Sequence, residues 1–133
     1  LGARWVDKDT LLRQADHLVI VVPYSESSHH AIGAAELALM KATATLTNVA
    51  RGGVVDDAAL AQALADKRIA AAALDVFEGE PQVHAALLKV PNVVLTPHIA
   101  SATVATRMKM ATLAADNLIA VLNGRAPLTP VKA

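Results

Sequence analysis

The sequence contains no cysteine and only three aromatic residues, Trp5, Tyr24 and Phe77, among its 133 residues. The lack of cysteine excludes disulfides, thiolate catalysis and cysteine-ligated zinc, and it is consistent with a reducing compartment such as the cytoplasm. Three aromatic residues are also too few for the base-stacking surface of an RNA-recognition domain. These absences restrict any chemistry of the chain to side chains other than thiols.

An excess of charge of either sign is also absent, since 12 Lys and Arg balance 12 Asp and Glu. A net charge of zero favours neither nucleic acid nor an anionic membrane as a partner. No apolar run approaches the roughly 20 residues that cross a bilayer, and no signal peptide opens the chain. The length allows one domain at most, and the first residue, Leu1, leads us to expect a fragment of a longer protein.

The sequence does contain a regular alternation of short apolar runs and helical stretches. The apolar runs are nearly continuous, which predicts the strands of a parallel sheet buried on both faces. The expected strands span residues 17–22, 44–49, 70–76 and 93–96. The alternation predicts an α/β fold, namely an incomplete doubly wound (Rossmann-like) parallel sheet with a long C-terminal helix.

Local signals mark the helices. Asp9 is expected to cap a helix over 10–15, and Asp56 is expected to cap a helix over 57–65. Two further helices are expected over 33–40 and 102–123. The last of these should end at Gly124, and its apolar stripe predicts core packing. In a fragment this apolar stripe would lose part of the protein that packs against it, so we expect the isolated chain to expose apolar surface and to self-associate.

Charged side chains follow three of the expected strands, at the point where each strand ends. Arg51 follows the second strand, Asp75 lies at the end of the third with Glu80 just beyond it, and His98 follows the fourth. Ligands of open parallel sheets bind at this carboxyl edge. Arginine binds a carboxylate with two parallel hydrogen bonds, histidine transfers a proton near neutral pH, and a nearby carboxylate favours the imidazolium form. This set suits the reduction of a 2-oxo acid, with the hydride coming from a cofactor because no side chain supplies one.

Three ordered motifs carry a family resemblance. They are Asn-Val-Ala-Arg-Gly-Gly-Val-Val-Asp at 48–56, Ala-Leu-Asp-Val-Phe-Glu-Gly-Glu-Pro at 73–81 and Thr-Pro-His-Ile-Ala-Ser-Ala-Thr at 96–103. Together they resemble the D-isomer-specific 2-hydroxyacid dehydrogenases, in the C-terminal part of the NAD-binding domain. The stretch 83–88 and the tail are most similar to the glyoxylate/hydroxypyruvate reductase and 2-ketogluconate reductase branch of that family.

The resemblance implies a role for individual residues. Arg51 would hold the substrate carboxylate, His98 would donate a proton to the carbonyl oxygen, and Glu80 would keep His98 protonated. Contacts with the cofactor are implied for Val22, Pro23, Val49, Ala50, Arg51, Asp75, His98, Ala100 and Ser101. The implied cofactor is NAD or NADP, and the implied substrate is a small 2-oxo acid that is reduced to the D-2-hydroxy acid. The full-length form is expected to be a homodimer.

One part of the family pattern is missing from this chain. The Gly-x-Gly-x-x-Gly turn that binds the pyrophosphate is absent, and the only close pair of glycines is Gly52-Gly53. We therefore interpret residues 1–101 as the second part of a dinucleotide-binding domain, and residues 102–133 as an interdomain helix and tail that return toward a substrate domain. The missing turn also leaves open a non-catalytic fragment or pseudoenzyme that acts only in association, or a transcriptional co-regulator on the same scaffold.

Alternatives also exist for single residues. Ser101, His98 and Asp75 could suggest a hydrolase triad, but no Gly-x-Ser-x-Gly elbow surrounds Ser101, which could equally cap the last helix. His29 and His30 are adjacent, so we expect them to point in different directions into solvent. Glu78 is expected to be a solvated loop acid, and we expect no metal site because no closed ligand set is visible.

Overall fold

The computed structural model describes residues 2–131 and divides into two compact units, one ending at His98 and the other beginning at Ile99. We refer to them as unit 1 and unit 2. The sequence placed a boundary after residue 101, and the interdomain role of the tail stays a prediction. Among the described residues, no helix has both the length and the apolar character needed to cross a membrane.

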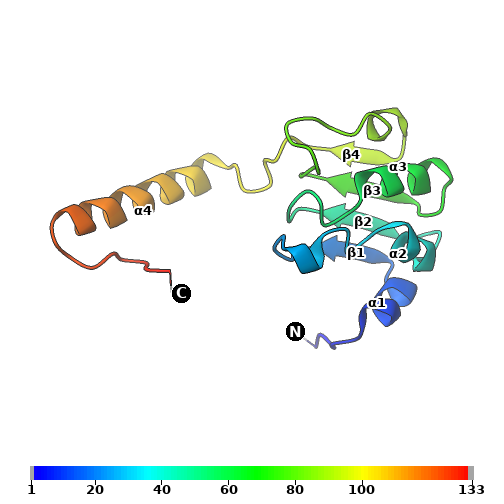
Figure 1. Cartoon of the computed structure of the whole chain (residues 1–133), viewed down its shortest axis with the longest axis horizontal. Helices are drawn as coiled ribbons and strands as arrows, with labels where there is room; N and C mark the ends of the chain where they lie inside the picture. The colour runs from blue at the N-terminus through cyan, green and yellow to red at the C-terminus, as the bar shows by residue number, and fades with distance from the viewer. Residues whose placement is uncertain (1, 132–133) are drawn as a thin grey trace. The chain divides into compact units, whose positions relative to one another are not determined.

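Unit 1 contains four parallel strands in the order β1-β2-β3-β4 (Figure 1). The strands are β1 (His17–Ile20), β2 (Thr45–Asn48), β3 (Ala71–Leu74) and β4 (Val93–Leu95). Its helices are α1 (Lys8–Gln14), α2 (Ala34–Leu39) and α3 (Asp57–Ala65), with 3-10 turns η1 (Glu26–Ser28) and η2 (Leu87–Lys89). The predicted α/β fold is confirmed, and the strands follow chain order, as in one half of a doubly wound sheet.

The helices of unit 1 pack against one face of the sheet. Helix α2 contacts both α1 and α3, and side chains alternate between buried and exposed along β1. The prediction of a sheet buried on both faces is wrong for the described residues, because Val19 and Val94 are 54% and 62% exposed. Crossovers between parallel neighbours are almost always right-handed, so strands in chain order place their helices on the same face.

The strands are shorter than the apolar runs that predicted them. The run at 17–22 forms a strand only to Ile20, the residue that pairs with Asn48 at the end of β2. Beyond this point the chain after β2 turns away, so Val21 and Val22 have no strand to pair with. They are 73% and 47% exposed. The length of an apolar run therefore overestimates the length of a strand when the neighbouring strand in the sheet ends earlier.

Side-chain caps fix where α1 and α3 begin. The carboxylate of Asp56 accepts a hydrogen bond from the backbone N–H of Ala59 at 2.9 Å, which confirms the predicted start of α3. The predicted cap of α1 is wrong: Asp7, not Asp9, accepts from the N–H of Thr10 at 2.8 Å. Two aspartates lie two positions apart here, and the propensity of the residue type alone does not distinguish them.

Unit 2 consists mainly of α4 (Val104–Leu122). Its cap is Thr103, whose hydroxyl accepts from the N–H of Thr106 at 3.1 Å, so the alternative that Ser101 caps the helix is wrong. Gly124 follows the helix with a φ of +69°, in the left-handed conformation that commonly ends helices. Of the described α4 residues only Ala120 is buried.

Candidate active site

A cleft of about 810 Å³ lies at the carboxyl ends of the first three strands. The register places Ile20, Asn48 and Leu74 level with one another, so the segments that follow these strands meet at one edge. The lining residues are Val21, Val22, Pro23, Tyr24, Val49, Ala50, Arg51, Gly52, Phe77, Glu78, Glu80 and His98. The expectation that the charged residues converge at this edge is met for Arg51, Glu80 and His98.

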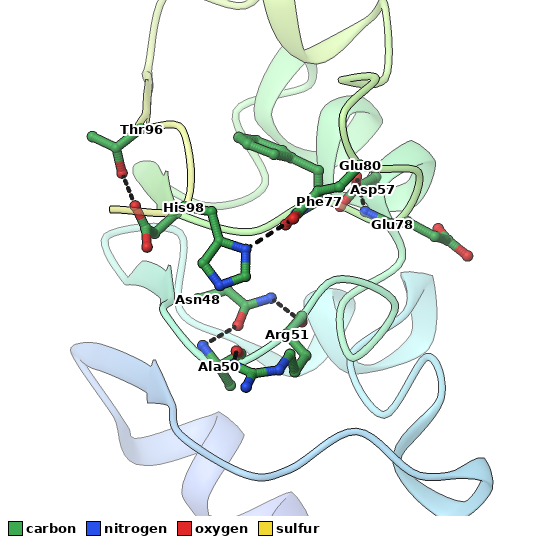
Figure 2. Close-up of polar contacts among 10 residues, drawn as sticks. Asn48, Ala50, Arg51, Asp57, Phe77, Glu78, Glu80, Thr96 and His98 are labelled. Atoms are coloured by element: carbon green, nitrogen blue, oxygen red, sulfur yellow. Dashed lines mark hydrogen bonds and ion pairs between the residues drawn. The ribbon is translucent and has the colours of Figure 1, made fainter. Parts of the chain in front are cut away.

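Asn48 holds the turn that carries Arg51. Only 2% of Asn48 is exposed. Its Oδ1 accepts from the N–H of Ala50 at 3.1 Å, and its Nδ2 donates to the carbonyl of Arg51 at 3.0 Å (Figure 2). Nη1 of Arg51 donates to the carbonyl of Ala50 at 2.6 Å, which uses one of the five donors of a guanidinium group. The turn is thus fixed by a buried side chain, while Arg51 itself is exposed in the cleft.

Gly52 brings this turn into direct contact with the segment after β3. A Cβ atom at position 52 would lie 1.7 Å from the carbonyl oxygen of Phe77, so only glycine fits. The backbone N–H of the same Phe77 donates to Oε1 of Glu80 at 3.0 Å. The backbone of Phe77 therefore lies between the turn of Arg51 and the side chain of Glu80, which fixes the spacing between the two loops.

Glu80 and His98 form an ion pair across the cleft wall. Oε2 of Glu80 lies 2.8 Å from Nδ1 of His98, and the two side chains are 35% and 48% exposed (Figure 2). The hydrogen bond with His98, followed by that from Phe77, lowers the pKa of Glu80 below its usual value. Glu80 is therefore held as a carboxylate, the form that stabilises a protonated imidazole next to it. His98 has a φ of +54°, so its backbone is in the left-handed region.

Asp75 lies beneath this surface, at the end of β3. It is 4% exposed and does not line the cleft. Oδ1 of Asp75 accepts from the hydroxyl of Thr96 at 2.6 Å. The proposed contact of Asp75 with a cofactor stays a prediction. Ala100 and Ser101 belong to unit 2, so the same holds for their proposed contacts.

Two interpretations of loop residues hold only in part: His29 and Glu78 are exposed, as expected, but each has a close side-chain neighbour. The rings of His29 and His30 do not point apart but stack, with centroids 3.9 Å apart and planes at 22°. Glu78 is not simply a solvated acid, because its Oε1 lies 2.7 Å from Nε2 of His30. Adjacent residues can share a direction when the second has a left-handed backbone, and φ of His30 is +48°.

Sequence reasoning missed the residues that support the site. Asn48, Gly52, Phe77 and Thr96 act through backbone and buried contacts rather than through exposed charge. A polar residue at the end of an apolar strand, directly before a glycine-containing turn, was the available signal for Asn48. The contacts of Phe77 and Thr96 join segments far apart in sequence, and no local pattern indicates them.

The cleft also presents exposed apolar side chains beside its charged groups. Val22 and Val49 line it while remaining 47% and 39% exposed, and Tyr24 is 51% exposed. Apolar side chains with a few polar groups between them are the usual lining of cofactor sites. The residues present therefore suit the ring-binding part of a dinucleotide site, while the glycine turn for the pyrophosphate is not in the sequence.

Comparison with known proteins identifies relatives over most of the chain. A glyoxylate reductase of Thermococcus onnurineus is 51% identical over 131 residues, which are 98% of this chain and 39% of the relative. A glyoxylate/hydroxypyruvate reductase B of Enterobacter agglomerans is 56% identical over 125 residues, 93% of this chain and 39% of the relative. The chain thus spans about two fifths of the length of these relatives.

Solved structures share the fold. The NADPH-dependent glyoxylate/hydroxypyruvate reductase of Sinorhizobium meliloti, in complex with NADP and malonate, matches with a TM-score of 0.92 and 44% identity. The match covers 98% of this chain and 41% of that protein. The D-lactate dehydrogenase of Lactobacillus jensenii with NAD+ matches with a TM-score of 0.86 and 35% identity, over 96% of this chain and 43% of that one. Residues 1–100 match the sequence pattern described as D-isomer specific 2-hydroxyacid dehydrogenase, NAD binding domain, and the chain belongs to this family.

Proposed function

We propose that the protein of which this chain is part reduces a small 2-oxo acid, of the glyoxylate or hydroxypyruvate type, to the D-2-hydroxy acid. The observation that carries this proposal is the presence of Arg51, Glu80 and His98 around one cleft, with Glu80 already paired to His98. The relatives are named glyoxylate reductase and glyoxylate/hydroxypyruvate reductase, which supports the same activity. These names do not favour the alternative of a non-catalytic protein.

Each side chain has one task in this reaction. The guanidinium of Arg51 binds the substrate carboxylate, and its fork geometry fixes the orientation of the neighbouring carbonyl. Because Nδ1 of His98 faces Glu80, Nε2 is the nitrogen that donates a proton to the carbonyl oxygen. The carbonyl carbon receives a hydride and the oxygen receives this proton, which together give the hydroxy acid. Glu80 stabilises the imidazolium before the transfer and orients the ring.

The hydride is the contribution of a nicotinamide cofactor, NADH or NADPH. Val22, Pro23 and the backbone from Val49 to Arg51 are proposed to contact it, because they line the cleft beside the charged groups. Asp75, His98, Ala100 and Ser101 are proposed to lie near the nicotinamide. Tyr24 and Val22 are exposed enough to cover a flat ring.

Turnover of glyoxylate and hydroxypyruvate by the complete protein, with NADH and with NADPH, tests the proposal. His98→Ala should lower kcat by about 10²–10⁴-fold, the usual contribution of a general acid, while cofactor affinity is retained. Arg51→Ala should weaken 2-oxo acid binding far more than cofactor binding, because the change leaves the backbone in place. Unchanged turnover in both variants would contradict the assigned roles.

We also propose that the complete protein is a cytoplasmic homodimer. Apolar side chains of α4 support an association surface, since Met108, Leu118 and Leu122 are 61%, 60% and 76% exposed. Light scattering of the 133-residue chain at high concentration should detect self-association. A clean monomer would contradict the proposal that this surface pairs copies of the chain.

A further inference from the structure

His29, His30 and Glu78 form a cluster of potential metal ligands at the rim of the cleft. One ligand atom from each residue lies within 4.8 Å of the others. The two imidazole rings stack at 3.9 Å, and Nε2 of His30 is 2.7 Å from Oε1 of Glu78. The residues come from two segments, the one between β1 and α2 and the one after β3, so the cluster joins them.

The backbone holds the histidine pair in place. The N–H of His30 donates to the carbonyl of Gly53 at 2.8 Å, and the N–H of Ile32 donates to the carbonyl of Val54 at 3.1 Å. A Cβ atom at Gly53 would lie 2.9 Å from the ring of Tyr24, so this segment packs closely on the next turn. Two histidines on such a segment are positioned before any ligand arrives, which lowers the entropy cost of binding.

A polar oxygen also lies near the second ring nitrogen of each histidine, within hydrogen-bond distance for His29 and just beyond it for His30. Nδ1 of His29 is 3.3 Å from the hydroxyl of Tyr24, and Nδ1 of His30 is 3.8 Å from a carboxylate oxygen of Asp56. Histidines that bind metals almost always donate their other N–H to a carboxylate, a carbonyl or water, which fixes the tautomer. Tyr24 is placed to accept from Nδ1 of His29, whereas Asp56 has to approach His30 by a few tenths of an ångström before it accepts. With both N–H groups accepted in this way, the Nε2 atoms are left for an ion.

We propose that His29, His30 and Glu78 bind a divalent transition-metal ion of the zinc type, in place of the sequence-based expectation that there is no metal site. Imidazole nitrogen with one carboxylate suits zinc, whereas magnesium and calcium prefer oxygen ligands throughout. Two donors about 2.0–2.1 Å from a tetrahedral zinc ion are about 3.3 Å apart. The 2.7 Å separation between His30 and Glu78 therefore has to widen by only a fraction of an ångström. A fourth position remains for water.

A metal ion at this position would also affect the cleft. Tyr24 and Glu78 both line the cleft and both belong to this cluster or its outer shell. A bound ion would fix these two walls relative to each other. The proposal concerns a binding site outside the reductase chemistry, and it holds or fails independently of that activity.

Calorimetric titration of the 133-residue chain with zinc chloride, in buffer free of chelators, tests the site. We expect one ion per chain, with weaker binding as the pH falls because protons compete for the histidine nitrogens. His29→Ala and Glu78→Gln should each lower the affinity at least 10-fold. Tyr24→Phe, which removes only the hydroxyl, should lower it about 10-fold, the usual effect of losing an outer partner. His17→Ala is the control, because His17 bonds to Thr45 at the other end of the sheet.

Thermal unfolding gives a second measurement that also reports whether each variant folds. An ion that binds only the native state raises Tm, and chelation with EDTA reverses the shift. The zinc-dependent increase should be present in wild type and His17→Ala and lost in His29→Ala and Glu78→Gln. Equal zinc affinity in wild type and Glu78→Gln, or a loss in His17→Ala as large as in His29→Ala, would overturn the proposal in favour of adventitious binding by surface histidines.

Discussion

Units 1 and 2 differ in how they place their apolar side chains. In unit 1 each helix buries leucine on its inner face, with Leu12, Leu37 and Leu60 at most 1% exposed, although Leu11 on the outer face of α1 is 42% exposed. In unit 2 the leucines of α4 are exposed, with Leu113 at 45% and Leu118 at 60%. Both helical regions carry the same kind of apolar periodicity in the sequence. Periodicity therefore indicates a helix with an apolar face, but not what covers that face.

The two units therefore differ in what stabilises them. The burial of leucines stabilises unit 1 through the hydrophobic effect, which scales with the apolar area removed from water. Helix α4 gains little from this source, so its helical structure depends more on the Thr103 cap, the Gly124 terminus and intrinsic propensity. Paired substitutions in the two units can test this contrast directly.

Replacing a leucine by alanine should give the largest difference in stability between the two units. Leu60→Ala in α3 removes a fully buried side chain and should lower the free energy of unfolding by about 2–5 kcal/mol. At a concentration low enough to keep the chain monomeric, Leu118→Ala in α4 should change it by no more than about 0.5 kcal/mol, because most of that side chain is exposed in the single chain. Urea denaturation followed by circular dichroism measures both. A large loss for Leu118→Ala in the monomeric chain would mean that α4 is covered without a second copy, and it would contradict the contrast between the two units.

Glycine substitutions give the next largest difference. Gly52→Ala forces a Cβ atom against the carbonyl of Phe77 and should cost about 3 kcal/mol, at the upper end for overpacking. Gly124→Ala meets no atom within 4 Å and carries only the left-handed backbone penalty of about 1–2 kcal/mol. Global unfolding should shift for Gly52→Ala. For Gly124→Ala the expected change is fraying of α4, seen as a small loss of helical ellipticity without a matching shift in the urea midpoint.

These contrasts indicate which features the sequence could predict. Helix α3 was predicted with its bounds because an N-cap and an apolar stripe lie within nine residues of each other. The convergence of Arg51, Glu80 and His98 followed from their positions after the expected strands, since the carboxyl ends of parallel strands lie at the same edge of a sheet. The bounds of β1 were not predictable, because they depend on where β2 ends. The contact between His30 and Glu78 spans 48 positions, and no local pattern encodes it.

Two asparagines, Asn48 in unit 1 and Asn117 in unit 2, give a third comparison. The expected changes in the free energy of unfolding are smaller than for the leucines and glycines. Asn48 makes two hydrogen bonds in the buried turn of unit 1, and Asn117 makes two with Thr129 in unit 2, both at 3.0 Å. Asn48→Ala leaves the N–H of Ala50 and the carbonyl of Arg51 without this partner and should cost about 1–3 kcal/mol. Asn117→Ala should cost about 0.5 kcal/mol, because water replaces its bonds. Equal losses in urea denaturation would contradict the argument from burial.

Asn48→Asp separates the two bonds of Asn48. The aspartate oxygen can still accept from the N–H of Ala50, but it cannot donate to the carbonyl of Arg51. In the complete protein we expect a higher KM for the 2-oxo acid, because the carbonyl of Arg51 loses its hydrogen bond and the turn that positions the guanidinium is released. A fall in stability without any change in KM would make Asn48 a structural residue only.

The smallest expected change in stability comes from the buried carboxyl group of Asp57 in unit 1. Asp57 is 4% exposed, and this burial raises the pKa of its carboxyl, although the N–H of Glu78 donates to Oδ2 at 3.0 Å and opposes the shift. Above the raised pKa the carboxylate is charged in both states, and the native state bears the full cost of desolvation. As the pH falls from the raised pKa toward the ordinary value, the native state binds its proton first and the cost disappears.

Asp57→Asn removes this titration while its amide oxygen can still accept from Glu78. At pH 7 the variant should differ from wild type by less than about 1 kcal/mol, since relief from desolvation is offset by the loss of a negative charge at the N-terminus of α3. The free energy of unfolding of wild type relative to Asp57→Asn should then rise as the pH is lowered from 7 toward 4. Urea denaturation at several pH values measures this difference. A relative fall on acidification would mean that the carboxylate of Asp57 is stabilised in unit 1, and that burial there carries no electrostatic cost at this position.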